Sequence, residues 1–253
     1  MTLFISVVNH NHDEMICGNS TLKDLALEHQ VILKSNTQAS TSLKKYCEEN
    51  QIHLIQGTNR KGFGANNNEV FRYAEKKLGM KNNDYFLVLN PDVEIDAFTI
   101  FELLKRVKKD NSLISTINLY RDREMTIYDN SIRRFPSLLN PIKTLFGMKR
   151  TDHYDKSKIS TSLHVDWAAG SFLLFEFSVY EQLNGFDEKY FMYFEDADIC
   201  RRASMKDILI TYYPYYKAIH DAQFNNRSIF TKTFIYYAHS NFRYFITSIL
   251  ERK

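Results

Sequence analysis

The stretch DYFLVLNPDVEI, from Asp84 to Ile95, joins a short apolar run to an Asn-Pro-Asp turn. An apolar run of this length that ends in a turn signal indicates a buried strand. Three similar runs precede it, and segments with helical periodicity separate them. This alternation predicts an α/β fold, with a Rossmann-like, mostly parallel sheet covered by helices on both faces. The expected strands are residues 3–9, 31–36, 52–59 and 84–95, and the expected helices lie around 22–28, 41–49, 67–78 and 97–109.

Polar residues follow each of these expected strands. Parallel strands end at one edge of a sheet, and the ligands of such sheets bind outside that edge. The residues of interest are therefore 9–13, Ser35 with Asn36, 59–68 and 90–92. The histidines and the aspartate in the first of these segments lack the spacing of a zinc site, so we interpret them as loop residues beside a nucleotide.

The composition indicates a globular chain with a sizeable core. Of its 253 residues, 44% are hydrophobic and 25% are charged, and a net charge of +3 is too small to imply nucleic acid as a partner. Three separated cysteines form no CxxC pair, which argues against disulfides or zinc and favours a reducing cytoplasm. The apolar run of residues 3–8 is short for a signal peptide, and no run approaches the about 18 apolar residues of a membrane span. We therefore expect a cytoplasmic protein, soluble or peripheral to a membrane.

The second half of the chain is patterned differently. A basic, less regular region covers residues 120–158, and strands are expected at 165–177 and 208–214. Between these strands, GFDEKYFMYFEDADICRR (185–202) places carboxylates directly behind an aromatic run, and a helix is expected over 196–205. Burying a bare carboxylate is costly, so the pattern indicates the rim of a site. The last residues, 229–253, are typical of an aromatic and basic helix.

The acids of that stretch have different expected roles. Asp198 can pair with Arg201 or Arg202 one helical turn later, so we interpret it as structural. One of the adjacent acids Glu195 and Asp196 is then left to face a cavity, where a carboxylate at an apolar rim suits a general base. The alternative is a solvated helix start that the helix dipole favours.

Asp92 is the carboxylate of the Asn-Pro-Asp turn. A hard divalent cation bound to a diphosphate needs one or two protein carboxylates, and Asp92 could supply one with Asn90 assisting. The alternative is a plain turn, where these residue types are common. Later in the chain, His220 is either a metal ligand or an ordinary core histidine, and Arg227 is a candidate phosphate clamp.

The stretch TNRKGFGANNNEVF, residues 58–71, looks like a phosphate loop but lacks the spacing of a Walker motif. Gly62 and Gly64 permit a close approach of the backbone to a ligand. The asparagines at 66–68 could cap the following helix, whose N-terminus favours anions. The alternative is a glycine turn with an asparagine cap.

Taken together, these motifs resemble one family, the inverting, metal-dependent glycosyltransferase family 2 with the GT-A fold. The likeness runs from about Leu3 to the tail, and its specific motifs are FLVLNPDVEI, VDWAAGSFLLF, NGFDEKYFMYFEDADICRR and AIHDAQFNNRSIFTKTF. Within the family, the chain is similar to bacterial rhamnosyltransferases of O-antigen and cell-wall polysaccharide assembly, which use dTDP-L-rhamnose.

The resemblance implies a role for each matched residue. Asp196, beside Glu195, falls on the catalytic-base motif, and Asp92 and His220 fall on a site for Mg²⁺ or Mn²⁺. Ser35 stands where many relatives carry an aspartate, and its hydroxyl can still hydrogen-bond a thymine or uracil edge. The implied donor-binding residues are Asn9, Ser35, Asn36, Asn59, Gly62, Phe63, Gly64, Asn67, Asn90, Asp92 and Arg227, and the implied acceptor-binding residues are Trp167, Gly170 and Tyr193.

The resemblance also implies a single GT-A domain over residues 1–253, with a nucleotide-sugar half (1–118), an acceptor and catalytic half (119–228) and a helical tail (229–253). The implied partners are dTDP-L-rhamnose and a lipid-linked acceptor, a sugar such as GlcNAc on a polyprenyl diphosphate. The tail implies weak association with the inner face of the cell membrane, or alternatively packs on the enzyme itself. Two other functions stay open: the same chemistry with a UDP-hexose donor, and a catalytically silent, membrane-associated assembly protein.

Overall fold

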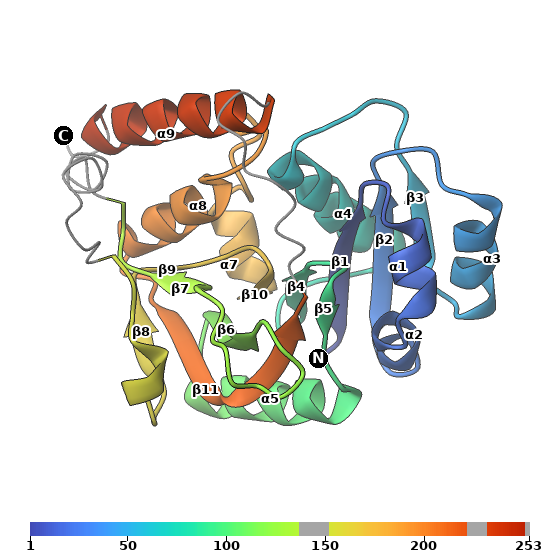
Figure 1. Ribbon diagram of the computed structural model, residues 1–253, viewed down its shortest axis with the longest axis horizontal. Helices are drawn as coiled ribbons and strands as arrows, with labels where there is room; N and C mark the ends of the chain where they lie inside the picture. The colour runs from blue at the N-terminus through green and yellow to red at the C-terminus, as the bar shows by residue number, and fades with distance from the viewer. Residues whose placement is uncertain (137–151, 222–231, 251–253) are drawn as a thin grey trace.

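The computed structural model describes residues 1–136, 152–221 and 232–250. Over these residues the chain forms a mixed nine-stranded sheet with helices packed against it, and a separate two-stranded sheet (Figure 1). The elements of the first half are β1 (Leu3–Asn9), α1 (Asp13–Gly18), α2 (Thr21–Ala26), β2 (Gln30–Ser35), α3 (Thr41–Glu49), β3 (His53–Gln56), α4 (Phe63–Leu78), β4 (Tyr85–Leu89), β5 (Val93–Glu94), α5 (Ala97–Asp110) and β6 (Ile114–Tyr120).

The second half contributes several short strands, the long strand β11, and three helices of which α9 is the longest among the described residues. Its elements are β7 (Ile132–Arg133), the 3₁₀ turn η1 (Lys156–Lys158), β8 (Leu163–Val165), β9 (Trp167–Ala168), β10 (Phe172–Glu176), α7 (Phe177–Gln182), α8 (Glu195–Ser204), β11 (Ile210–His220) and α9 (Lys232–Leu250).

The parallel part of the sheet comes from the first half of the chain. Strands β3, β2, β1 and β4 lie side by side in that order and pair in parallel. Alternate residues point to opposite faces, so that Ile5 and Val7 enter one hydrophobic core and Phe4 enters the other. Strands that are buried on both faces must be largely apolar, which is why continuous apolar runs in the sequence identified them. The predicted α/β class is confirmed.

The helix predicted to begin at Asn67 begins one turn earlier, at Phe63, and Gly62 is its N-cap. The asparagines at 66–68 lie inside α4, so the prediction that they cap the helix is wrong. The N–H of Phe63 instead donates to the carbonyl oxygen of Phe191 at 3.1 Å. A residue more than a hundred positions away therefore satisfies the helix start, and local sequence does not reveal it.

The far side of the sheet is mixed. β10 runs antiparallel between β4 and β6, and β11 is parallel to β6 but antiparallel to β5 and β8. The prediction of one strand over residues 165–177 is wrong, because parts of this segment pair with different partners: β8 with β11, β9 with β7, and β10 with β4. Periodicity also did not predict β6, α1 and α7.

β11 extends further than predicted and ends at His220, a predicted metal ligand. The strand continues through Pro214 to His220, with a register shift between Tyr213 and Lys217. Proline cannot donate to the strand ladder, so an irregularity is expected there. Beyond it, His220 pairs with Val93 of β5, which brings the strand end to the Asn-Pro-Asp turn.

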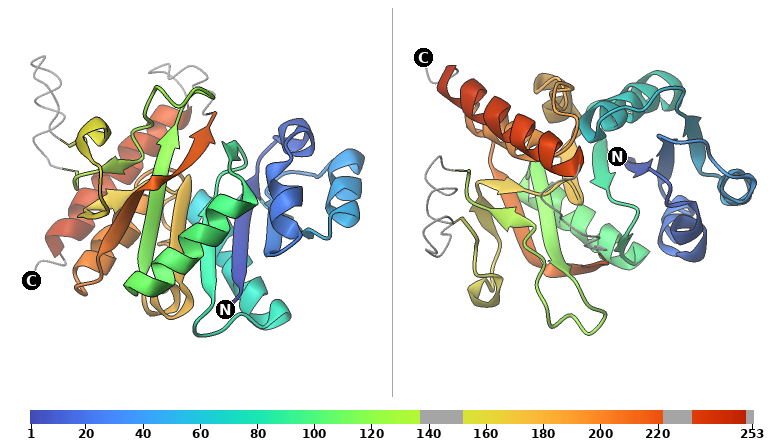
Figure 2. Two further views of the ribbon diagram at one scale, coloured as in Figure 1. Left: turned by 90° about the horizontal axis from the view of Figure 1, so that it is seen from below. Right: turned by 45° about the horizontal axis from the view of Figure 1, so that its top comes forward.

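Helix α9 confirms the predicted helical tail over Lys232–Leu250. It lies across α8 and the segment that precedes α8, on the side of the molecule away from α3 (Figures 1 and 2). Tyr244 is buried there with its ring 5.5 Å from that of Phe194, and the hydroxyl of Ser240 donates to the carbonyl oxygen of Met192 at 2.8 Å. None of the helices in the described ranges is long and apolar enough to cross a bilayer.

Candidate active site

The end of β4 and the end of β11 bring two predicted metal ligands together. The turn after β4 presents Asp92, and the N–H of Asp221 donates to its carbonyl oxygen at 3.0 Å. Oδ1 of Asp92 lies 3.4 Å from Nε2 of His220, and Nδ2 of Asn90 lies 3.5 Å from the same nitrogen. Residues that are 128 or more positions apart in sequence thus meet at one edge of the sheet, as strand-end geometry requires.

Asp129 completes this group, although no motif in the sequence pointed to it. Its Oδ2 lies 3.2 Å from Nδ1 of His220 and 3.7 Å from Nε of Arg121, and the residue is 7% exposed. Burial lowers the pKa of His220, but the neighbouring carboxylates of Asp129 and Asp92 outweigh this and raise it to about 9. A carboxylate that accepts from Nδ1 fixes the imidazole plane and directs Nε2 toward Asp92.

The residues present fit a divalent cation that is completed by a ligand. Among the described residues, no group of three acidic, histidine or cysteine side chains is arranged to hold a metal. Oδ1 of Asp92 is nevertheless buried, and within the described part of the chain its contact is the 3.4 Å ion pair with Nε2 of His220, which is longer than a normal hydrogen bond. A buried carboxylate oxygen with one long contact to a histidine suits Mg²⁺ or Mn²⁺, which take few protein ligands when a diphosphate supplies the rest.

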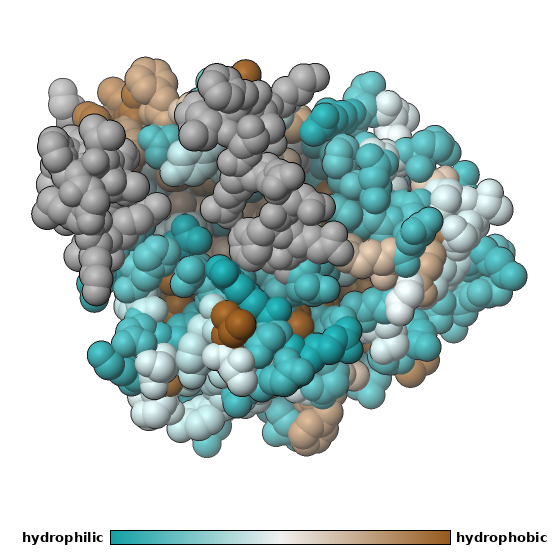
Figure 3. Space-filling model, in the orientation of Figure 1, coloured by the Kyte–Doolittle hydropathy of each residue, from teal (hydrophilic) through white to brown (hydrophobic). Residues whose placement is uncertain are grey.

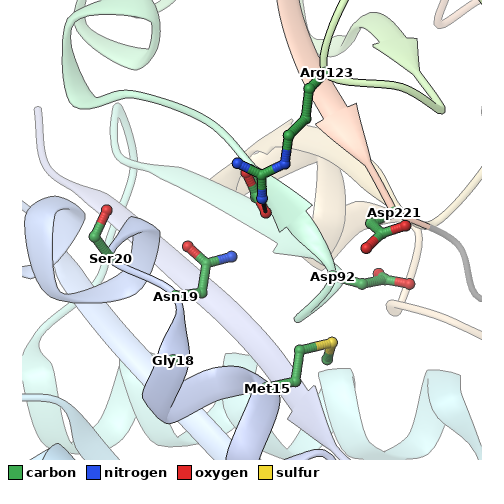
Figure 4. Close-up of a pocket in the computed structure, with 8 residues that line it drawn as sticks. Met15, Gly18, Asn19, Ser20, Asp92, Arg123 and Asp221 are labelled. Atoms are coloured by element: carbon green, nitrogen blue, oxygen red, sulfur yellow. Dashed lines mark hydrogen bonds and ion pairs between the residues drawn. The ribbon is translucent and has the colours of Figure 1, made fainter.

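A cavity of about 470 Å³ opens beside Asp92 (Figure 4). Asp92 and Asp221 lie at one wall, and the turn between α1 and α2 forms the opposite wall. Nη2 of Arg123 forms an ion pair with Oε1 of Glu94 at 2.6 Å. The lining is Met15, Gly18, Asn19, Ser20, Asp92, Glu94, Arg123 and Asp221, of which only Asp92 was predicted from the sequence.

The polar residues at the ends of β1 and β2 are engaged with one another. Nδ2 of Asn9 donates to Asp13 at 2.7 Å and to the hydroxyl of Ser35 at 2.9 Å, and both Asn9 and Ser35 are fully buried. Asn36 exchanges two hydrogen bonds of 2.9 Å with the backbone of Lys61. Asn9 and Ser35 therefore hold the strand ends in place, and Asn36 ties them to the glycine loop.

The glycine loop is shaped by close packing. A side-chain carbon at Gly62 would lie 2.5 Å from the carbonyl oxygen of Phe191, and one at Gly64 would lie 2.7 Å from the side chain of Phe186. Asn59 is exposed at the start of this loop. Asn67 is fully buried, accepts from the hydroxyl of Ser6 at 2.7 Å and donates to the carbonyl oxygen of Phe63 at 3.0 Å. Close packing against residues 186–191 therefore requires residues without a side chain at positions 62 and 64, independently of any ligand.

Glu195 and Asp196 begin α8 after a strained turn. Tyr193 and Phe194 have φ angles of 70° and 67°, which bulky residues rarely adopt and which cluster at functional sites. The Asp196 carboxylate accepts from the N–H groups of Ala197 at 2.8 Å and Gly170 at 3.2 Å. These donors favour the ionised form and hold the carboxylate in one orientation.

The two acids differ in their surroundings. Glu195 is 6% exposed, and its Oε2 accepts no hydrogen bond within the described ranges. Burial, together with the nearby charge of Asp196, raises the pKa of Glu195 to about 8. Burial also raises the pKa of Asp196, but backbone donors and the charge of Arg133 oppose it. The two carboxyl groups therefore titrate as one interacting pair, in which Asp196 has two backbone donors and Oε2 of Glu195 has none within the described ranges.

Asp198 is structural, as predicted. Its carboxylate oxygens lie 3.1 Å from Nη2 of Arg201 and 2.7 Å from Nε of Arg202, and the residue is buried. Both arginines, which lie one helical turn after Asp198 along α8, therefore pair with its carboxylate.

Of the predicted acceptor residues, Gly170 lies directly against Asp196. A side-chain carbon at Gly170 would lie 2.8 Å from the ring of Phe63 and 3.9 Å from Cβ of Asp196. Trp167 donates from Nε1 to the carbonyl oxygen of Arg134 at 2.9 Å. The ring of Tyr193 lies 5.8 Å from that of Tyr237 on α9. The predicted phosphate clamp Arg227 lies outside the described residues.

A family model matches the middle of the chain. The model described as Glycosyl transferase family 2 aligns with residues 32–183. The aligned segment contains the glycine loop, Asp92 and Trp167, and it ends before the acidic pair.

Curated relatives extend the likeness over most of the chain. The rhamnosyltransferase WbbL of Escherichia coli (strain K12) is 36% identical over 246 residues, which cover 96% of this chain and 92% of that protein. The low-salt glycan biosynthesis hexosyltransferase Agl10 of Haloferax volcanii is 30% identical over 87% of this chain and 67% of its own length. The N-acetylglucosaminyl-diphospho-decaprenol L-rhamnosyltransferase of Mycobacterium tuberculosis is 30% identical over 54% of this chain and 47% of its own length.

Solved structures share the fold at low sequence identity. GalNAc-T7 with UDP, GalNAc and Mn²⁺ matches with a TM-score of 0.60 and 14% identity, over 91% of this chain and 46% of that chain. S. aureus TarS 1-349 in complex with UDP-GlcNAc matches with a TM-score of 0.58 and 14% identity, over 88% of this chain and 61% of that chain. This chain therefore spans less than two thirds of either structure, and the likeness concerns the fold.

Proposed function

The chain belongs to glycosyl transferase family 2 and is a glycosyltransferase, and we propose that it transfers L-rhamnose from dTDP-L-rhamnose, with inversion, to a sugar on a polyprenyl diphosphate. The 36% identity with a rhamnosyltransferase over nearly the whole chain supports the sugar. The similarity to the mycobacterial N-acetylglucosaminyl-diphospho-decaprenol L-rhamnosyltransferase supports an N-acetylglucosaminyl-diphospho-lipid as the acceptor class. The carrying observation within the molecule is the Asp196 carboxylate, oriented by the N–H of Gly170 beside Trp167.

In the proposed mechanism, Asp196 accepts the proton of the attacking acceptor hydroxyl. Two backbone N–H groups favour the ionised form of its carboxylate and hold it in one orientation, and burial raises the pKa of the neighbouring Glu195 to about 8. Inversion requires the hydroxyl to attack from the face opposite the leaving diphosphate, so base and leaving group belong on opposite sides of the sugar.

We propose that the leaving diphosphate lies beside the cluster formed by Asp92, Asp129 and His220. Bound Mg²⁺ or Mn²⁺ would neutralise the charge that develops on the departing dTDP. Asp92 and His220 would hold the ion, and Asp129 would keep the imidazole of His220 in place. Asn90 lies next to this cluster, and Arg227 stays a proposed phosphate ligand.

The proposed donor half is residues 1–118 and the proposed acceptor half is 119–228. In the donor half, Asn36, Asn59 and the backbone of the 62–64 loop are proposed to contact the nucleotide, with Phe63 between the loop and the acceptor side. Asn9, Ser35 and Asn67 are proposed to shape this site, because their side chains are buried and already hydrogen-bonded. In the acceptor half, Trp167, Gly170 and Tyr193 are proposed to border the acceptor sugar.

We further propose that α9 rests on the inner face of the membrane that holds the acceptor lipid. Its buried face contacts α8 and residues 190–194, while apolar side chains occupy the opposite face. Hydrophobic residues are visible along the upper edge of the molecule, where Figure 1 places α9 (Figure 3). The exposed fractions are 66% for Ile235, 67% for Phe242, 40% for Ile246, 57% for Ile249 and 67% for Leu250. An aromatic and aliphatic face on a helix without acidic residues suits a bilayer interface.

A donor panel tests the proposed function directly. Purified protein is incubated with Mg²⁺ or Mn²⁺, a short-chain prenyl-diphosphate-linked GlcNAc and one nucleotide sugar at a time, and the released nucleotide diphosphate is measured. We expect dTDP-L-rhamnose to turn over faster than UDP-glucose and UDP-GlcNAc. A preference for a UDP-sugar would instead establish the hexosyltransferase alternative, and no turnover with any donor would favour a silent assembly protein.

A further inference from the structure

We propose that Arg133 binds the diphosphate of the acceptor, so that this enzyme recognises sugar 1-diphosphates and not the acceptor sugar alone. The proposal rests on the proposed function and deepens it, because it assigns a binding site to a part of the acceptor that does not react. It starts from the small two-stranded sheet formed by β7 and β9, which lies outside the main sheet.

The β7–β9 sheet presents Arg133 beside Trp167. The two residues are cross-strand partners in the antiparallel pair. The guanidinium carbon of Arg133 lies 5.4 Å from the centroid of the Trp167 ring, and Nε of Arg133 donates to the carbonyl oxygen of Asn130 at 3.0 Å. Stacking on the indole and this backbone contact hold the guanidinium in place on the sheet.

The same sheet leads directly to the catalytic base. Gly170 follows β9 by two residues, and its N–H donates to the Asp196 carboxylate. The positive charge of Arg133 is close enough to Asp196 to favour its ionised form. Arg133, Trp167 and Asp196 therefore border one region, with a cation and an aromatic face next to the group that activates the hydroxyl.

This combination matches the chemistry of a lipid-linked sugar. In a sugar 1-diphosphate, the negative diphosphate is attached to the ring whose hydroxyl must reach the base. A guanidinium is permanently charged and its planar fork matches phosphate oxygens, whereas tryptophan favours the apolar face of a sugar ring. By holding the diphosphate, Arg133 would fix the sugar with its reacting hydroxyl toward Asp196.

The chain offers a matched control in the next residue. Arg134 is exposed, and its guanidinium carbon lies 5.2 Å from the ring of Tyr154 rather than over Trp167. Successive residues of an extended chain point to opposite sides, so Arg134 carries the same charge in the same segment but on the other face. Arg134→Gln removes as much positive charge as Arg133→Gln without touching the proposed site.

Kinetics with two acceptors test the proposal. Both carry the same sugar, one on a short prenyl diphosphate and one as an alkyl glycoside without phosphate. We expect Arg133→Gln to raise KM for the diphosphate acceptor by about 10- to 100-fold, the range for losing a charge-assisted hydrogen bond, and to leave KM for the alkyl glycoside unchanged. Any effect of the lost charge on Asp196 should lower kcat equally for both acceptors. Arg134→Gln should alter neither value. An equal rise in KM for both acceptors, or the same rise in both variants, would overturn the proposal.

A binding measurement separates this proposal from the proposed function. Farnesyl diphosphate, which carries no sugar, is titrated calorimetrically into protein saturated with dTDP and Mg²⁺, so that the donor site is filled. We expect binding to the wild type and to Arg134→Gln, and at least tenfold weaker binding to Arg133→Gln. Equal affinity in all three proteins would refute the role of Arg133 even if transfer occurs. Selective loss would support it even if the donor or the reaction proves to be different.

Discussion

At the residue scale, Glu195 and Asp196 show how two adjacent carboxyl groups acquire different chemistry. Glu195 has a buried oxygen without a hydrogen bond in the described chain, whereas Asp196 accepts from two backbone N–H groups. Desolvation favours the neutral form of both acids, and at Asp196 backbone hydrogen bonds and the charge of Arg133 oppose it. These donors support the proposal that Asp196 is the base.

We expect Asp196→Asn to lower kcat by about two to four orders of magnitude, the usual range for a general base, because an amide cannot accept the proton. Affinity for dTDP, measured by calorimetric titration, should stay the same. Glu195→Gln is the control, since an amide resembles a protonated carboxyl in shape and charge, and it should retain most activity. If Glu195→Gln were the inactive variant, the roles of the two acids would be reversed.

Asp129 illustrates a positioning role on the metal side. A carboxylate that accepts from Nδ1 of a metal-binding histidine typically contributes 10- to 100-fold to metal affinity. We expect Asp129→Ala to weaken Mn²⁺ binding in the presence of dTDP by about that factor, measured from the electron paramagnetic resonance of free Mn²⁺. Asp129→Asn, which can still accept from Nδ1, should lose less.

The control for Asp129 is Asp110→Asn, which also breaks an aspartate–arginine pair but does so at the C-terminus of α5. It should leave Mn²⁺ affinity unchanged. Equal Mn²⁺ affinities in wild type, Asp129→Ala and Asp110→Asn would mean that Asp129 does not support a metal ligand.

At the scale of elements, the start of α4 depends on the absence of a side chain. A methyl group at Gly62 would lie 2.5 Å from the carbonyl oxygen of Phe191, a distance that requires the backbone to shift. We expect Gly62→Ala to lower the melting temperature of the free protein, measured by calorimetry. Gly18→Ala is the control, because nothing lies within 4 Å of the added carbon there. An unchanged melting temperature in Gly62→Ala would mean that this glycine serves only ligand binding.

We expect the buried and the exposed faces of helix α9 to have different functions. Replacing Phe242, Ile246 and Ile249 with serine removes apolar area from the exposed face and spares the buried Tyr244. We expect this variant to float less with anionic vesicles at low salt, and to lose transfer to a polyprenyl-linked acceptor more than to a short soluble one. Raised salt should weaken the flotation of the wild type.

A matched control for α9 is Phe98→Ser on α5, where the side chain is 70% exposed on a different helix. It should leave vesicle binding unchanged. If the α9 variant lost activity equally on both acceptors, or if the wild type did not bind vesicles, α9 would serve only to pack against α8 and the catalytic turn.

At the scale of the whole molecule, the raised pKa of Glu195 links the active site to global stability. Its pKa rises from 4.5 in the unfolded chain to about 8 in the folded protein. The native state therefore keeps a proton that the unfolded state releases, and the stabilisation is full below pH 4.5 and is lost as pH rises through 8. We expect wild type to lose stability relative to Glu195→Gln between about pH 5 and pH 8, measured by urea unfolding. A constant difference over this range would mean that Glu195 is ionised in the folded state.

The sequence by itself determined the α/β class, the parallel strands of the first half and the helical tail. Buried parallel strands must be continuous apolar runs, and turns after them must be polar, so local composition records both. It also indicated Asp92, His220 and the acidic pair as candidates, through the types of residue that follow strands and through family motifs. These features depend on residues that are neighbours in the chain.

Only the tertiary structure decided how the candidates are grouped and which are free to act. Asp129 meets His220 across 91 positions, and Gly170 meets Asp196 across 26, so no local pattern contains either contact. Residues 165–177 divide among the end of β8, β9 and β10 because these strands pair with different partners: β8 with β11, β9 with β7, and β10 with β4 and β6. Asn9, Ser35 and Asn67 carried polar chemistry in the sequence, but the fold buried them and satisfied their hydrogen bonds. Contacts between distant segments set the burial and the hydrogen-bond partners of each carboxylate, and no local pattern in the sequence records them.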